Sequence, residues 1–173
     1  MAVSGFPSEV RWGLSGNTKP KFKDPASLTS PSVSRLLRDW ERVRQSDRTG
    51  LNDLPAWSDF DVAEMGYILG RLNLLEIELS PTRYRFHVHG SAGASYIGDD
   101  LTGKYLEDYQ DEDYREFVKA AFTAAHRDRS PKVVIEKAFT LDKRILRWEG
   151  VILPLANDHV NPSHILTGYD FIT

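Results

Sequence analysis

The chain contains no cysteine among its 173 residues. Without a thiol there is no disulfide, no thiolate-bound metal ion and no cysteine nucleophile. Long hydrophobic runs are also missing, because no apolar stretch approaches the roughly 20 residues that a membrane-spanning helix needs. The N-terminus, MAVSGFPSEV, lacks the basic start and the continuous apolar segment of a secretory signal. These absences predict a cytoplasmic protein with no membrane partner.

An excess of positive charge is absent as well. The 22 Lys and Arg residues are outnumbered by 25 Asp and Glu residues, which leaves a net charge of −3. Nucleic acids and anionic membranes bind clustered positive surfaces, so this balance predicts neither kind of partner. With 40% hydrophobic residues, the chain has the composition of an ordinary globular protein, long enough for one domain and a tail.

The chain divides into three segments by composition. Residues 1–31 carry repeated Pro and Gly without any periodicity, which predicts an irregular N-terminal extension. Residues 32–66 follow as a helix and an irregular connector. Residues 67–173 hold every predicted strand and form the core of the domain.

An amphipathic helix is predicted at the start of the second segment. Ser30 or Ser32 can cap it, Pro31 suits its first turn, and apolar residues recur at steps of three and four. This apolar stripe either packs on a sheet of the same chain or forms a dimer seam or partner-binding surface. It consists of Val33, Leu36, Leu37, Trp40 and Val43.

A β-hairpin leads the core segment. A largely apolar strand over residues 72–79 is followed, after a short Pro-containing link, by an alternating strand over residues 84–89. Because successive side chains of a strand point to opposite faces, Tyr84, Phe86 and Val88 are expected to face the core. The side chains expected to face outward are those of Arg83, Arg85, His87 and His89.

Helices and further strands complete the core. A short helix is expected over residues 91–97, and a longer helix begins after Asp111 and stops before Pro131. Three strands follow, over residues 133–141, 145–155 and 163–172. Strands on both sides of a helical block predict an α+β fold, with an antiparallel sheet and helices packed on one face.

Several short motifs occur in an order that resembles the PAS sensory domain. Residues 98–106 read GDDLTGKYL and look like the G-x-x-L-x-G-x-x-L element that follows the second strand in many PAS domains. Other motifs are similar to a branch of single-domain PAS-like proteins, common in alphaproteobacteria and mostly uncharacterised. These are LLRDW, LP, DFD and WEGVILPL, at residues 36–40, 54–55, 59–61 and 148–155.

This resemblance covers residues 33–173 and implies a particular arrangement. It implies a five-stranded antiparallel PAS-like sheet with helices on one face. The N-terminal helix then covers the other face or forms a dimer seam. Residues 67–173 would be the PAS-like core.

PAS topology would also gather aromatic side chains around one space between the sheet and the helices. Tyrosines there suit an apolar cavity for a small ligand, because each buried hydroxyl needs a polar partner. Alternatively, the same side chains fill the core and leave only a small cavity. The candidate ligand-binding residues are Phe86, Tyr96, Tyr105, Tyr109, Phe117, Phe122, Trp148 and Tyr169.

Histidines are the candidates for cofactor and metal sites. The resemblance places His126 on the helix that carries the proximal ligand in haem-binding PAS domains, although polar residues surround its end of that helix. His87 and His89 have the spacing of two metal ligands, with Glu149 or His164 as further ligands, but neighbouring arginines favour a polar outer surface. No metal site is therefore predicted. Light-sensing PAS relatives form a flavin–cysteine adduct, and this chain cannot form one because it has no cysteine. The cofactor is left unassigned.

No catalytic motif is found. Acidic pairs lie in turns and at helix starts, where capping explains them, and neither a nucleophile elbow nor a glycine-rich phosphate loop occurs. The resemblance implies a non-enzymatic sensory or regulatory domain that binds a small-molecule ligand or a protein partner. It would signal through its N-terminal helix and through a homodimer formed by that helix or a sheet face. The alternative is a haem- or flavin-type sensor or carrier.

Overall fold

The computed structural model describes residues 10–11, 19–46, 53–109, 111–140 and 145–172. Within them an antiparallel sheet has the strand order β1-β4-β5-β6-β2-β3. Its strands are β1 (Val10–Arg11), β2 (Leu72–Glu78), β3 (Arg83–His89), β4 (Lys132–Thr140), β5 (Ile145–Leu155) and β6 (His164–Ile172). Apart from the two-residue β1, these are the five strands of the expected PAS-like sheet.

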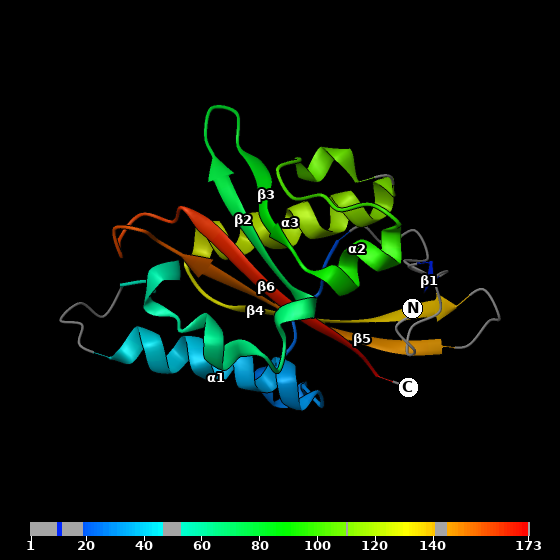
Figure 1. Ribbon diagram of the computed structural model, residues 1–173, viewed down its shortest axis with the longest axis horizontal. Coiled ribbons are helices and arrows are strands. Elements are labelled where there is room, and N and C mark those ends of the chain that lie inside the picture. Colours follow the sequence, from blue (N-terminus) through cyan, green and yellow to red (C-terminus); the bar gives the residue numbers. More distant parts are fainter. Residues whose placement is uncertain (1–9, 12–18, 47–52, 110, 141–144, 173) are drawn as a thin grey trace.

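Helices cover the two faces of this sheet unequally. Figure 1 shows α1 (Pro31–Gln45) beneath the sheet, and α2 (Ser91–Ile97) and α3 (Glu112–Asp128) above it. Short 3-10 turns occupy the connections, at Pro25–Ser27, Trp57–Asp59, Val62–Met65, Leu69–Arg71 and Leu106–Asp108. The predicted α+β fold, with the N-terminal helix on the second face, is confirmed. No helix in the described part of the chain is long and apolar enough to cross a lipid bilayer.

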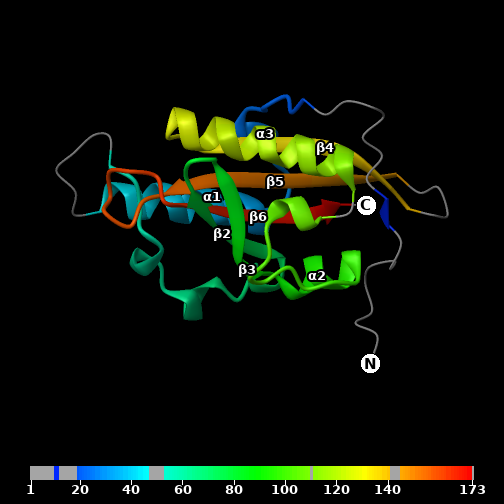
Figure 2. The same ribbon diagram turned by 90° about the horizontal axis from the view of Figure 1, so that it is seen from above.

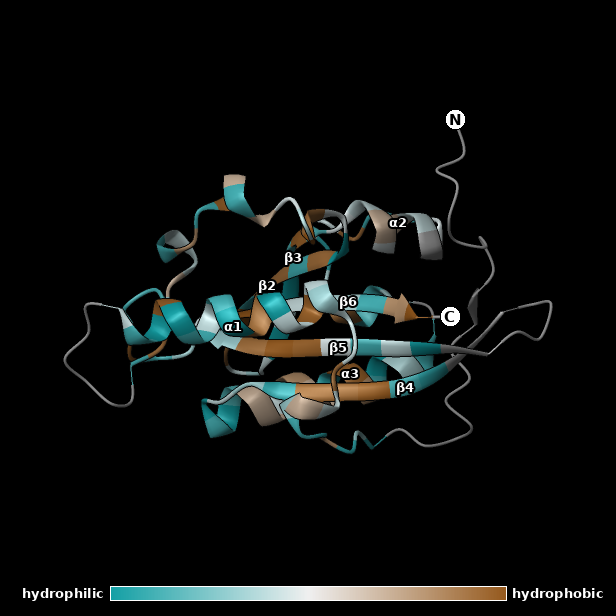
Figure 3. Cartoon of the chain, turned by 90° about the horizontal axis from the view of Figure 1, so that it is seen from below, coloured by the Kyte–Doolittle hydropathy of each residue, from teal (hydrophilic) through white to brown (hydrophobic). Residues whose placement is uncertain are grey.

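Helix α1 forms as its sequence pattern predicts. Ser30 accepts a hydrogen bond from the amide of Val33 at the first turn, and Pro31 occupies the first helical position. All five residues of the apolar stripe are buried, and Val33, Leu36, Leu37 and Trp40 share one hydrophobic core with the chain's own sheet. Trp40 also donates its indole N–H to the carbonyl of Pro154 at 3.1 Å. Figure 3 shows this helix lying across β5 and β6.

The opposite face of the sheet is packed by α3. Asp111 caps this helix by accepting from the amide of Tyr114 at 2.9 Å, and Arg129 ends it in the left-handed conformation. Figure 2 shows α3 lying alongside β4 and β5. The apolar side of the helix meets the aromatic side chains of the sheet in a second core. The helix contributes Phe117, Val118, Ala121, Phe122, Ala124 and Ala125 as buried residues. Strands β5 and β6 therefore separate two hydrophobic layers.

A β-bulge interrupts the pairing of β2 with β3. Leu74 pairs with Val88 and Leu75 with Phe86, so His87 has no partner on β2. Beyond this extra residue the side chains exchange faces. Val88 is 39% exposed, whereas the His89 side chain is only 5% exposed. The prediction that Val88 faces the core and His89 faces outward is therefore wrong.

The outer edge of β3 is partly closed by the turn that follows α2. Phe86 exchanges backbone hydrogen bonds with this turn, donating to Lys104 at 2.8 Å and accepting from Gly103 at 2.7 Å. Gly103 has a φ of 81°, which a residue with a side chain rarely adopts. Of the predicted extension, residues 1–9 and 12–18 lie outside the described residues, while Lys23 donates to the carbonyl of Val133 in β4.

Candidate functional site

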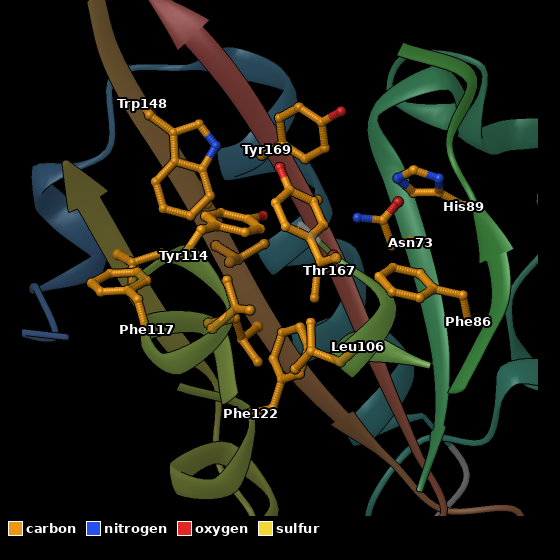
Figure 4. A pocket seen from close by; sticks show the side chains of 17 residues that line it. Asn73, Phe86, His89, Leu106, Tyr114, Phe117, Phe122, Trp148, Thr167 and Tyr169 are labelled. Carbon is orange, nitrogen blue, oxygen red and sulfur yellow. The ribbon is translucent and has the colours of Figure 1, made fainter. Parts of the chain in front are cut away.

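A cavity lies between the sheet and helix α3, in the space that the PAS resemblance indicated (Figure 4). The volume of the cavity is about 50 Å³, and about 560 Å³ of atom-free space is counted when its open mouth is included. An engineered cavity of about 150 Å³ is known to bind benzene, and a buried water needs only about 10–15 Å³. This cavity therefore accommodates a few small atoms.

Most of the wall is apolar and aromatic. Trp148 on β5 and Phe86 on β3 form opposite sides, and α3 supplies Phe117 and Phe122. Phe117 meets the Trp148 ring edge-on, with centroids 6.4 Å apart. Such contacts hold the rings in place, so the wall of the cavity has a fixed shape.

The polar part of the wall comes from β2, β3 and β6. Asn73 and His89 pair directly across the β2–β3 ladder, and Thr167 and Tyr169 lie on β6 beside them. Figure 4 shows the amide nitrogen of Asn73 and the ring of His89 pointing toward the side of the cavity where Thr167 and Tyr169 lie.

Asn73 is oriented by the backbone. Its Oδ1 accepts a hydrogen bond from the amide of Gly90 at 3.0 Å, so its Nδ2 group is directed away from that contact. Gly90 can approach so closely because it has no side chain: a Cβ there would lie 2.6 Å from the carbonyl oxygen of Gly70. The tight passage of the chain at Gly90 thus sets the orientation of the Asn73 amide.

His89 is oriented in the same way. Its Nδ1 accepts a hydrogen bond from the amide of Leu101 at 3.0 Å, so the neutral ring carries its proton on Nε2. Burial lowers the pKa of His89, although the nearby carboxylates of Asp100 and Asp99 act in the opposite direction. A Cβ on Gly93 would lie 2.9 Å from this Nε2 and 3.0 Å from the Tyr169 hydroxyl.

The predicted pocket residues are largely brought together. Phe86, Tyr109, Phe117, Phe122, Trp148 and Tyr169 line the cavity. Tyr105 does not: its ring stacks under the Arg83 guanidinium at 3.6 Å and its hydroxyl donates to Glu78 at 3.2 Å, so it belongs to a charged surface cluster. Tyr96 lies in α2, but its side chain falls outside what the structure describes.

Sequence reasoning missed three polar residues of the wall, Asn73, His89 and Thr167. Asn73 lies between two leucines and Thr167 follows Ile165 and Leu166, and a polar residue within such an apolar run is a signal that could have identified them. His89 gave no such signal, because only the bulge at His87 turns it inward. Tyr114, Leu106 and Val118 also line the cavity.

A second polar site, on the α1 side of the same strands, holds the start of that helix. Glu149 on β5 is completely buried there. Its carboxylate accepts from the amides of Thr29 and Ser30, at 2.9 and 2.8 Å, and from Arg147 Nε at 2.7 Å. Burial alone raises the pKa of Glu149, but these donors outweigh it and hold the pKa below its ordinary value.

The neighbouring strand contributes a second carboxylate. Asp170 on β6 pairs directly with Glu149 across the β5–β6 ladder. It accepts from the Ser30 hydroxyl at 2.8 Å and forms an ion pair with Arg71. We call Thr29, Ser30, Glu149 and Asp170 the α1 anchor. The anchor thus places two adjacent, hydrogen-bonded carboxylates beside the helix N-terminus, whose dipole favours negative charge.

The histidines do not gather into a metal or haem site. His87 is exposed, His89 faces the cavity and Glu149 faces α1, so the predicted common face does not exist. No group of three metal-type ligands is found among the described residues. His126 is not among the residues that line the cavity, and haem and flavin are both far larger than a space of about 50 Å³. The cavity does not fit either cofactor.

Comparison with known proteins gives a consistent result. A model of the PAS domain family (PAS_5) matches residues 28–169, from just before α1 into β6. No curated protein matches the chain. PAS domains are generally sensory and signalling modules, and typically have no catalytic activity of their own. Family match, strand order and the cavity between sheet and α3 agree, and the chain belongs to the PAS domain family.

Proposed function

We propose that this PAS domain is a non-enzymatic sensory module in which occupancy of the cavity changes the hold of the sheet on α1. One observation carries the proposal: consecutive residues of two central strands serve the two sites. Trp148 lines the cavity and Glu149 belongs to the α1 anchor, and the same holds for Tyr169 and Asp170 on β6.

The physical coupling follows from strand geometry. Adjacent residues of a strand point to opposite faces, so a rotation or shift that moves one side chain also moves its neighbour. Glu149 pairs with Asp170, and Gly150 pairs with Tyr169, so both strands present the same alternation at the same level. A small adjustment around a ligand is thereby passed to four hydrogen-bonded groups of the anchor. Packed interfaces respond to such shifts by changing between discrete arrangements.

In this proposal the domain signals by binding a protein partner through the exposed side of α1. The apolar stripe of this helix is buried by its own sheet, so a second copy seated on that stripe would have to displace the sheet. The exposed side carries Arg35, Arg38 and Arg42, which suits an acidic partner better than an identical helix. A homodimer through the helix or another sheet surface remains a measurable alternative. Native mass spectrometry of the purified protein reports its subunit count and any bound mass.

The coupling is tested by a substitution confined to the cavity side of β5. A Cβ on Gly150 would lie 3.1 Å from the Trp148 ring, so Gly150→Ala displaces that ring slightly without touching α1. Amide hydrogen exchange of Thr29 and Ser30, which donate to Glu149, is then measured by NMR. We expect their protection to change by about threefold or more relative to the amides of α3, equivalent to about 0.7 kcal/mol.

Gly66→Ala is the matched control. Gly66 is exposed, and a Cβ there would contact nothing within 4 Å. In the Gly66→Ala variant, the amide exchange rates of Thr29 and Ser30 should equal those of the wild type. If Gly150→Ala also leaves these two amides unchanged while it shifts the Trp148 resonances, the cavity and the anchor are uncoupled and the proposal fails.

A further inference from the structure

We propose that the cavity binds a small uncharged molecule through a carbonyl oxygen, with Asn73 Nδ2 and His89 Nε2 as the hydrogen-bond donors. This inference rests on the proposed function in that it names the ligand chemistry of the same cavity. The observation behind it is the bulge at His87, which places His89 opposite Asn73 on the cavity side of the sheet.

Both groups are fixed as donors by their second polar atoms. Gly90 N–H occupies Asn73 Oδ1 and Leu101 N–H occupies His89 Nδ1, at 3.0 Å in each case. What each side chain has left to offer is therefore an N–H: one of the Asn73 amide hydrogens, or the Nε2 hydrogen of His89. No described residue accepts a hydrogen bond from either nitrogen. Two preoriented donors on one side of an apolar space are complementary to a ligand oxygen.

The charge distribution favours a neutral ligand. None of the residues that line the cavity is Asp, Glu, Lys or Arg. The carboxylate of Asp100 lies 3.8 Å from His89 Nδ1 on the far side of the ring. Burial lowers the pKa of His89, which keeps its ring neutral at pH 7. An anionic ligand would lose its hydration without gaining a cationic partner, and an ammonium ligand would face N–H groups.

The size of the space sets the size of the ligand. About 50 Å³ is well below the roughly 150 Å³ that accepts benzene, so a ligand of a few heavy atoms is expected. Phe86, Phe122 and Trp148 would then contact its apolar part, with the carbonyl oxygen directed to Asn73 and His89 (Figure 4).

Three probes of four heavy atoms separate the alternatives: acetone, acetate and isopropylammonium. Each is titrated into the ¹⁵N-labelled full-length protein at pH 7, and the amide shifts of Gly90 and Leu101 and the Asn73 side-chain resonances are followed. We expect acetone to shift these signals saturably, with a Kd at least about tenfold lower than that of acetate or isopropylammonium. Tighter binding of acetate would identify a carboxylate ligand, and tighter binding of isopropylammonium an amine; either result overturns the proposal.

Asn73→Asp tests the role of the donor directly. The substitution keeps an oxygen for Gly90 N–H and replaces the inward N–H groups by an acceptor, so acetone affinity should fall about tenfold or more. Asn157→Asp, at an exposed loop position, adds the same charge outside the cavity and should leave affinity unchanged. If neither the wild type nor Asn157→Asp shows a saturable acetone shift at Gly90 and Leu101, the proposal is wrong. The coupling test with Gly150→Ala uses no ligand, so the two proposals fail separately.

Discussion

Replacing Glu149 by Gln removes one negative charge from the α1 anchor while preserving the size of the side chain. The carboxylate receives the amides of Thr29 and Ser30, the Thr29 hydroxyl and the Arg147 guanidinium. A glutamine retains one oxygen, and its NH₂ group must face at least one of these donors. The substitution therefore loses one or two charge-assisted hydrogen bonds at a completely buried position.

The expected loss of stability follows from these contacts. A hydrogen bond to a charged group contributes about 1.5–3 kcal/mol, so Glu149→Gln should lower the free energy of unfolding by about 3 kcal/mol. For a domain of this size, 1 kcal/mol corresponds to about 2–4 °C, so Tm should fall by about 6–12 °C. Urea denaturation followed by tryptophan fluorescence measures the first quantity, and calorimetry the second. Hydrogen exchange should show the loss concentrated in α1 rather than α3.

The pH dependence provides an independent check. The pKa of Glu149 lies below its ordinary value of 4.5, so the ionised carboxylate stabilises the folded protein fully above that pH. This contribution is lost as the pH falls from about 4.5 through the folded-state pKa. The stability difference between wild type and Glu149→Gln should therefore shrink in acid. Glu116→Gln, at an exposed position of α3, serves as the control.

Two results would refute this reasoning. The first is a free energy of unfolding for Glu149→Gln within about 0.5 kcal/mol of the wild type, since surface substitutions have effects of that size. The second is a stability difference that stays constant between pH 7 and pH 3. Either would mean that the carboxylate is not what holds the start of α1 to the sheet.

The seating of α1 leads to two further predictions. A Cβ on Gly168 would lie 2.4 Å from Leu36 Cδ2 and 2.8 Å from Ile68 Cδ1, so Gly168→Ala should destabilise the protein by about 1–3 kcal/mol in urea, whereas Gly66→Ala should not. An unchanged midpoint would show that the helix is loosely seated. Trp40→Phe leaves the buried Pro154 carbonyl without its indole donor and should cost about 2 kcal/mol or more, measured by circular dichroism. If Trp40→Phe changes only the fluorescence intensity and leaves the stability measured by circular dichroism unchanged, this prediction is wrong.

Periodicity was sufficient to predict most of the fold. The apolar steps from Val33 to Val43 and from Phe117 to Ala125 correctly identify the two long helices, because each apolar side faces a sheet. Strand positions also agree within a residue or two, since the apolar runs are bounded by turn residues. Which face α1 would cover could be inferred only through the family resemblance.

The candidate site was predictable only in part. Aromatic residues on the predicted strands and on α3 were correctly placed around one space, since large apolar side chains must be buried. Tyr105 was misplaced because a tyrosine can also stack on an arginine at the surface. Glu149 gave no sign of burial in the sequence, because its donors, Thr29 and Ser30, are about 120 residues away along the chain.

The bulge at His87 has a consequence for how such domains diverge. The segments on either side of the bulge each keep their own pairing with β2, Phe86 with Leu75 and Val88 with Leu74. Deleting His87 would join them into a regular ladder in which Val88 still faces outward and His89 still faces the cavity. A relative that is one residue shorter at this point would therefore present the same imidazole to the interior. Strand alternation read from the sequence would identify the inward face correctly in that shorter relative, although it fails in this chain.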